Sequence, residues 1–113
     1  MSISNQDLLR HILDEAQFLL KSTSGITLEN LVDDPILSRA VIRSREIIGE
    51  ASKKVEDSFK EKHPEIEWKK MAGTRDRLIH DYFSADYEIL WDVFEHKLPD
   101  LQRSIQSILN TSL

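Results

Sequence analysis

Apolar residues recur at three- and four-residue spacings along most of the chain, the pattern typical of amphipathic helices. The first run covers residues 8–20 and follows Ser4, whose side chain is suited to cap a helix. Gly25 comes soon after the run and predicts its end, because glycine readily adopts the left-handed conformation of a helix C-cap. Thr27 then predicts the cap of one short helical turn.

A second, longer run begins at Asp34-Pro35, a start signal in which proline gives up an N–H that has no partner at the first helical position. It continues to Phe59 and predicts a helix of roughly 25 residues. His63-Pro64 ends this helix, because the residue before proline is disfavoured in the helical region.

The central stretch, residues 68–83, reads W-K-K-M-A-G-T-R-D-R-L-I-H-D-Y-F and predicts a third helix. Arg75 lies on its apolar stripe, where a permanent charge requires a partner, solvent or a second chain. His80 lies about 140° round the helix from Arg75, whereas Tyr82 returns to nearly the same face as Arg75. A helix with Arg and Tyr on one face and His on another is more typical of a cleft than of a hydrophobic core.

Two more helices complete the expected fold. Asp86 predicts the cap of a fourth helix, and Leu98-Pro99-Asp100 predicts a corner before a short last helix. The chain shows neither an internal repeat nor the alternation typical of strands. We therefore expect one all-α domain over residues 1–113, a bundle of four main helices plus a short C-terminal fifth helix.

The composition and charge of the chain exclude several classes of function. The chain has 113 residues, no cysteine and a formal net charge of −5. The missing cysteine excludes disulfides, thiolate metal ligands and a cysteine nucleophile, and the acidic balance disfavours a general duplex-DNA binder. Residues 39–54 nevertheless carry five Lys/Arg against two Glu, and residues 68–80 carry four against one Asp. These two stretches predict one locally basic surface if they pack side by side.

Other classes of site find little support. His80-Asp81 is a doublet of a kind found in metal sites, but the remaining histidines show no matching spacing, so no metal site is expected. Glycine-rich phosphate loops and a nucleophile elbow are absent from the sequence. No apolar run approaches the ~20 residues of a membrane span, and the first residues do not resemble a signal peptide, so we expect a cytoplasmic protein without a membrane partner.

Taken together, four pieces of sequence resemble the HEPN superfamily and, within it, the HepT-type RNase toxins of toxin–antitoxin systems. They are R-D-R-L-I-H-D-Y-F at residues 75–83, W-K-K-M-A-G-T at 68–74, I-I-G-E-A at 47–51, and D-Y-E-I-L-W-D-V at 86–93 followed by L-P-D-L. The resemblance extends from about Asp34 to the C-terminus.

The resemblance implies a homodimer in which Arg75 and His80 of both chains converge on one cleft and cut RNA without a metal. His80 suits the role of acid or base because its pKa lies near neutrality, and Arg75 suits that of phosphate clamp. The expected products carry 2′,3′-cyclic phosphate ends. The residues expected to support this site or to steer RNA are Glu50, Lys69, Lys70, Arg77 and Asp81.

Tyr82 has a different implied role. In HepT-type systems an MntA-like nucleotidyltransferase antitoxin transfers AMP from ATP to the tyrosine of the R-x4-H-x-Y motif. ATP and Mg²⁺ would then belong to the antitoxin, and no cofactor is expected in this chain. The alternative hypothesis is a non-catalytic helical dimer that docks a nucleotidyltransferase or RNA. A metal-dependent hydrolase is a more distant third hypothesis.

Overall fold

A computed structural model describes residues 4–72 and 96–111 of the chain. The described residues form helices and connecting loops without any strand, which confirms the all-α prediction. The predicted fourth helix and most of the central one lie outside the described residues. The described helices are α1 (Asn5–Thr23), α2 (Leu28–Asp33), α3 (Pro35–Lys54), α4 (Asp57–Lys62) and α7 (Leu98–Thr111), together with a helical segment at residues 68–72.

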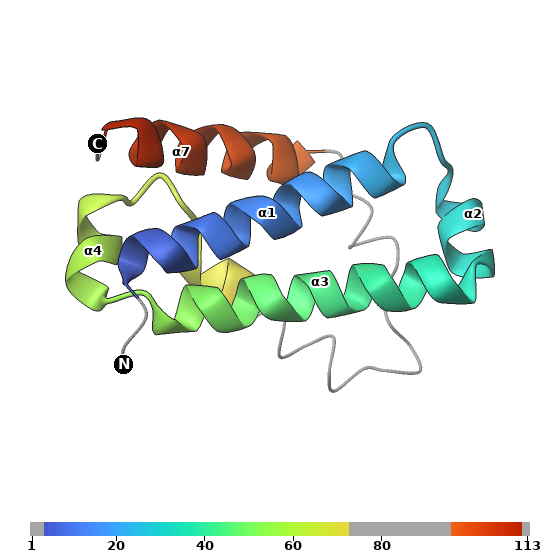
Figure 1. Ribbon diagram of the computed structural model, residues 1–113, viewed down its shortest axis with the longest axis horizontal. Coiled ribbons are helices and arrows are strands. Elements are labelled where there is room, and N and C mark those ends of the chain that lie inside the picture. Colours follow the sequence, from blue (N-terminus) through green and yellow to red (C-terminus); the bar gives the residue numbers. More distant parts are fainter. Residues whose placement is uncertain (1–3, 73–95, 112–113) are drawn as a thin grey trace.

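Helix α1 lies between α3 and α7 and contacts both of them. Figure 1 shows α3 and α7 running in the direction opposite to α1, so that both chain ends lie at the same end of the bundle. The short helix α2 links α1 to α3 at the other end. Leucine, isoleucine and alanine side chains on one face of α1, among them Leu9, Ile12, Ala16 and Leu19, are fully buried and form the middle of the core.

The local start and stop signals of the sequence are confirmed. The Ser4 hydroxyl accepts a hydrogen bond from the Asp7 N–H at 3.1 Å and caps α1. Gly25 has a φ of 76°, the left-handed conformation expected after α1. Thr27 caps α2, and the Asp34 carboxylate accepts hydrogen bonds from two N–H groups of the first turn of α3, both at 3.0 Å. These caps satisfy donors that a helix N-terminus leaves without intrahelical partners.

The predicted helix of roughly 25 residues is confirmed over most of its length but is wrong at its C-terminal end, from residue 55 onward. Helix α3 has 20 residues and ends at Lys54, and Val55 takes an extended conformation with φ −65° and ψ 136°. This bend buries the Val55 side chain, which is only 2% exposed. The Glu56 N–H donates to the Asn5 side-chain oxygen of α1 at 3.2 Å. Tertiary contacts therefore end the helix where its own sequence would let it continue, and Phe59 belongs to α4.

Of the two remaining helix boundaries predicted at prolines, one is confirmed and the other is wrong. Helix α4 ends at Lys62, directly before His63-Pro64, as predicted for that proline. The predicted corner at Leu98-Pro99-Asp100 is wrong, because these residues form the first turn of α7, which has 14 residues. Pro99 is tolerated there because N–H groups of a first helical turn lack intrahelical partners in any case.

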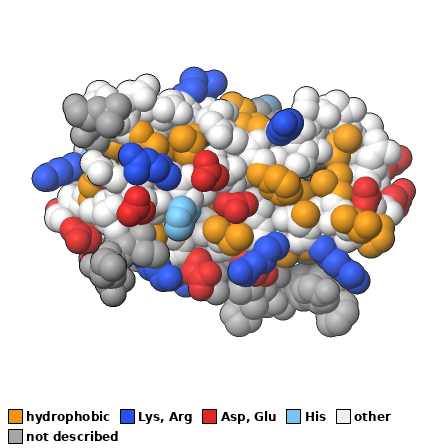
Figure 2. Space-filling view, in the orientation of Figure 1, with side chains coloured by type: hydrophobic (Ala, Val, Ile, Leu, Met, Phe, Trp, Pro, Cys, Tyr) orange, Lys and Arg blue, Asp and Glu red, His pale blue; other side chains and the backbone are white. Residues whose placement is uncertain are grey.

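Among the described residues, three large apolar side chains remain on the surface: Phe18, Val32 and Ile36, which is 82% exposed. They belong to the last half of α1, to α2 and to the first turn of α3. Figure 2 shows hydrophobic side chains gathering toward this end of the molecule. Among the helices that the structure describes, none is both long and apolar enough to cross a membrane.

Candidate functional site

The predicted R-x4-H-x-Y motif lies outside the described residues, which end at Ala72 and resume at His96. Arg75, His80 and Tyr82 therefore remain predictions, and so do the two motif neighbours Arg77 and Asp81. Of the residues assigned to the site from sequence, the structure describes Glu50, Lys69 and Lys70.

Residues 68–72 lead directly into the motif and are held firmly on the core. Trp68 and Met71 are buried, with exposures of 8% and 7%. The indole N–H of Trp68 donates to the His63 carbonyl oxygen at 3.0 Å, and the Met71 N–H donates to the Glu67 carbonyl oxygen at 3.1 Å. The start of the helix predicted from sequence at residue 68 is therefore confirmed.

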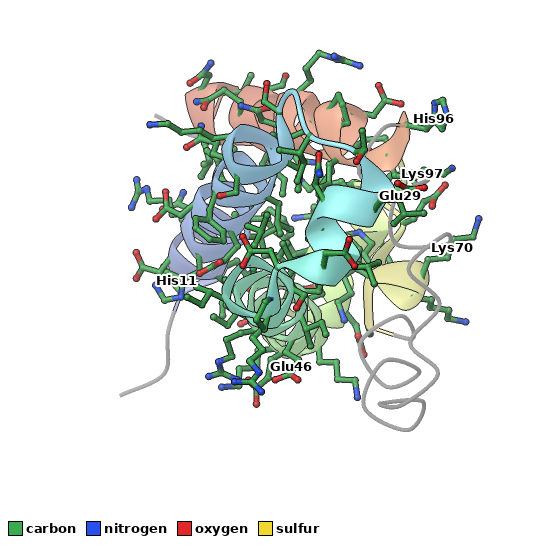
Figure 3. The ribbon with its side chains drawn as sticks, turned by 90° about the vertical axis from the view of Figure 1, so that its right-hand side faces the viewer. His11, Glu29, Glu46, Lys70, His96 and Lys97 are labelled. Carbon is green, nitrogen blue, oxygen red and sulfur yellow. The ribbon has the colours of Figure 1, made fainter. Side chains whose placement is uncertain are left out.

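Lys69 and Lys70 lie on the opposite face of this segment and are exposed. Lys70 forms an ion pair with Glu67 (Nζ–Oε2, 3.7 Å), and Lys97 pairs with the other oxygen of the same carboxylate (Nζ–Oε1, 3.3 Å). Such exposed pairs contribute little to stability, because water screens them. Figure 3 shows Lys70, His96 and Lys97 on one side of the molecule and His11 on the opposite side. Cationic side chains thus gather beside the segment that enters the motif.

Glu50 is exposed on α3. Its expected role in supporting the site stays a prediction because Arg75 and His80 lie outside the described residues. The local basic surface expected from residues 39–54 is smaller than the sequence count implies. Arg39 and Arg43 are exposed, but Arg45, which was counted with them, is buried.

Arg45 is the residue that the motif analysis missed. It is 3% exposed, and its Nε lies buried without a hydrogen-bond partner. Burial lowers the pKa of the guanidinium to about 10, so the group still carries its charge at neutral pH. The signal was present in the sequence: Arg45 lies four residues after Val41 and three before Ile48, on the apolar stripe of α3. Like Arg75, Arg45 is a permanently charged residue on an apolar stripe and therefore requires a partner, solvent or a second chain.

Among the described residues, no group of three or more His, Asp or Glu side chains is arranged to hold a metal ion. Glu67, which directly precedes residues 68–72, is instead paired with Lys70 and Lys97.

Comparison with known proteins places the chain in a family. The model of the family described as "Ribonuclease HepT-like" matches residues 12–108, a range that includes most of α1 and α7, all of α3 and the whole R-x4-H-x-Y motif. No solved structure is significantly similar to the chain.

Curated relatives resemble the chain over nearly its full length. A protein of Caldanaerobacter subterraneus subsp. tengcongensis named "Putative RNase TTE0752" is 46% identical over 101 residues, which cover 89% of this chain and 90% of the relative. A protein of Thermococcus cleftensis named "Probable ribonuclease HepT" is 39% identical over 108 residues, which cover 96% of this chain and 98% of the relative. The chain therefore belongs to the HepT-like ribonuclease family.

Proposed function

We propose that this protein is a metal-independent endoribonuclease toxin that uses Arg75 and His80 of both chains of a homodimer. The observation that carries the proposal is the family match, which spans residues 12–108 and therefore contains the complete R-x4-H-x-Y motif. The names of the two relatives, both of which refer to ribonucleases, support the same reaction class.

The proposed reaction needs only groups that the chain supplies. His80 of one chain takes the proton of the 2′-hydroxyl, whose oxygen attacks the adjacent phosphorus atom. The P–O5′ bond breaks, and His80 of the other chain gives a proton to the leaving 5′ oxygen. Arg75 stabilises the negative charge that develops on the phosphoryl oxygens. The products are a 2′,3′-cyclic phosphate and a 5′-hydroxyl end.

The spacing of the motif supports the proposed dimer. If residues 75–80 form the helix that the sequence predicts, Arg75 and His80 point about 140° apart, and one helix does not aim both groups at one phosphate. Two such helices that face each other can supply Arg from one chain and His from the other. Light scattering at micromolar concentration tests this arrangement, and a monomer under those conditions would contradict it.

Two features of the described residues support RNA as the substrate. Trp68 and Met71 fix the segment before the motif on the core, as a preorganised site requires. Lys69 and Lys70 are exposed on that same segment, where they would attract the phosphate backbone although the net charge of the chain is −5.

Regulation forms part of the proposal. A nucleotidyltransferase antitoxin of the MntA type transfers AMP from ATP to Tyr82 with the help of its own Mg²⁺. The added phosphate brings negative charge and bulk next to the phosphate-binding groups, and so repels RNA. This chain itself needs no cofactor.

The experiment that tests the nuclease uses purified full-length protein, a labelled RNA and buffer containing EDTA. Wild-type protein should cleave the RNA, and His80→Ala should lose about 10²–10⁴-fold in rate, the usual contribution of a general acid or base. His11→Ala is the matched control, because His11 is exposed on the side of the molecule opposite Lys70 and Lys97. A His80→Ala protein that keeps half of the wild-type rate, or a wild-type activity abolished by EDTA, contradicts the proposed mechanism.

The acidic net charge of −5 favours a second candidate, a helical dimer that docks its nucleotidyltransferase partner without cutting RNA. The same assay separates the two candidates. A docking module predicts the same background RNA cleavage for wild type and for His80→Ala, together with undiminished binding of the nucleotidyltransferase by both proteins.

A further inference from the structure

A small cavity of about 160 Å³ lies between α3, residues 65–67 and the first turns of α7. Its apolar walls are Ile66, Met71, Leu98 and Leu101, and the guanidinium-bearing residue Arg45 lines it as well. A cavity needs only about 10–15 Å³ of this measure to hold one water molecule, so the space suffices for a small organic molecule.

Arg45 is the unusual member of this lining. No hydrogen bond or ion pair joins it to any other residue that the structure describes, and its Nε is buried without a partner. Buried charges in proteins are as a rule paired, because removing an ion from water is costly. A guanidinium offers a planar fork of donors that matches the two oxygens of a carboxylate.

The acids of the chain that line the cavity are engaged elsewhere. Three carboxylates belong to the lining: two of them form ion pairs with cationic side chains other than Arg45, and the third lies within hydrogen-bond distance of a histidine ring. Glu67 pairs with Lys70 and Lys97, Asp100 pairs with Arg103, and Glu65 contacts the Nδ1 atom of His63 at 3.3 Å. These three carboxylates are exposed at the solvent side of the cavity, whereas Arg45 is buried. The guanidinium of Arg45 is therefore left without a counterion among them.

This distribution of charge selects the class of ligand. An anionic group is favoured beside Arg45, apolar atoms are favoured along the walls, and further negative charge is disfavoured near the three carboxylates of the opening. A polyanion such as RNA or a nucleoside triphosphate does not fit this arrangement. We propose that the cavity binds a small organic monocarboxylate, whose carboxylate forms two hydrogen bonds with Arg45 and whose short apolar body packs against Ile66, Met71 and Leu98.

The test measures the thermal stability of the full-length protein with sodium butyrate as the probe. Butyrate at tens of millimolar should raise the Tm of wild type by about 2–5 °C, since a ligand that binds only the folded state stabilises it by mass action. Butyramide has the same shape without the charge and should give no rise. Sodium chloride keeps the ionic strength equal in all samples.

Two variants locate the effect. Arg45→Met keeps an unbranched apolar chain and should lose the rise, and it should fold well because it removes an unpaired buried charge. Arg43→Met changes an exposed arginine of the same helix and should keep the rise. The proposal is overturned by equal shifts in wild type and Arg45→Met, by equal shifts with butyrate and butyramide, or by no shift in wild type. A larger Arg45-dependent shift with inorganic phosphate than with butyrate would identify a phosphate site and overturn the carboxylate assignment.

Discussion

The indole Nε1 of Trp68 donates a hydrogen bond to the backbone carbonyl oxygen of His63, 3.0 Å away. Phe59 of α4 packs against both residues, with ring centroids 4.6 Å from His63 and 6.5 Å from Trp68. The loop between α4 and the segment at residues 68–72 is thus tied together across the turn at Pro64. The hydrogen bond therefore holds in place the segment that directly precedes the motif in the sequence.

Trp68→Phe should lower the free energy of unfolding by about 1 kcal/mol, because it keeps an aromatic ring in the core but leaves the His63 carbonyl without its donor. For a domain of this size such a loss corresponds to a fall of about 4–6 °C in Tm, which calorimetry detects easily. Phe18→Leu, a change at an exposed aromatic of α1, is the control and should stay within about 0.5 kcal/mol of wild type. A Tm of Trp68→Phe equal to that of wild type would show that the hydrogen bond is energetically neutral.

Arg45→Met should stabilise the fold in neutral buffer that contains no carboxylate. Burial lowers the pKa of Arg45 to about 10, and a shift of this size corresponds to roughly 3 kcal/mol of destabilisation by the buried charge. The folded pKa lies below the unfolded one, so above pH 10 the unfolded chain binds more protons than the folded chain. Wild-type stability therefore rises relative to Arg45→Met as the pH passes 10.

Urea denaturation of both proteins between neutral pH and about pH 11 measures this difference, and the titration of other groups cancels in the comparison. The excess in the free energy of unfolding of Arg45→Met over wild type should be complete below pH 10 and should shrink above it. Arg43→Met, whose side chain is 66% exposed in wild type, should show no such trend. An Arg45→Met protein less stable than wild type at neutral pH would mean that Arg45 makes a net favourable contribution to the fold.

Local signals in the sequence predicted the starts of helices well. Ser4, Thr27 and Asp34 cap their helices through hydrogen bonds to N–H groups two or three residues away, so the information is contained in a few neighbouring residues. The end of α3 could not be predicted in this way. It depends on the burial of Val55 and on a hydrogen bond from Glu56 to Asn5, which lies 51 residues earlier in the chain.

Some features of the candidate site could likewise be predicted from the sequence, and others could not. The family and the segment at residues 68–72 follow from sequence motifs, and both are confirmed. Arg45 was counted among the surface charges, although its place between Val41 and Ile48 on the apolar stripe of α3 indicated burial. Its lack of a counterion could not be read from the sequence, because that depends on how the loop at residues 63–67 and α7 are placed around it.

The lysine pair before the motif leads to a prediction on RNA binding. Lys69→Ala/Lys70→Ala should weaken RNA binding and lower the slope of log K against log salt by about 1–2, since each phosphate contact on a single strand contributes roughly 0.7. Measuring binding in the His80→Ala background keeps the RNA intact. Arg10→Ala/Lys21→Ala removes two exposed cations from α1 and should leave the slope unchanged. Equal slopes for both double variants would show that Lys69 and Lys70 do not contact the phosphates of bound RNA.

The final prediction concerns the modification of Tyr82. The sequence contains two tyrosines, Tyr82 and Tyr87, and only Tyr82 lies in the R-x4-H-x-Y motif. Incubation with the nucleotidyltransferase partner, ATP and Mg²⁺ should add one or more AMP groups to Tyr82 and abolish RNA cleavage, because the added phosphate competes for the groups that bind RNA. Tyr82→Phe should stay unmodified and active, whereas Tyr87→Phe should be modified and silenced like wild type.

Peptide mass spectrometry is the decisive measurement, since tight binding by the partner could inhibit the nuclease without any modification. The AMP mass should map to the peptide that contains Tyr82, and activity should fall in proportion to the modified fraction after the partner has been removed. Modification mapped to Tyr87, or a fully modified protein that still cuts RNA, contradicts this regulatory role. Neither result would affect the nuclease assignment, because that depends on the loss of cleavage in His80→Ala and not on the chemistry of Tyr82.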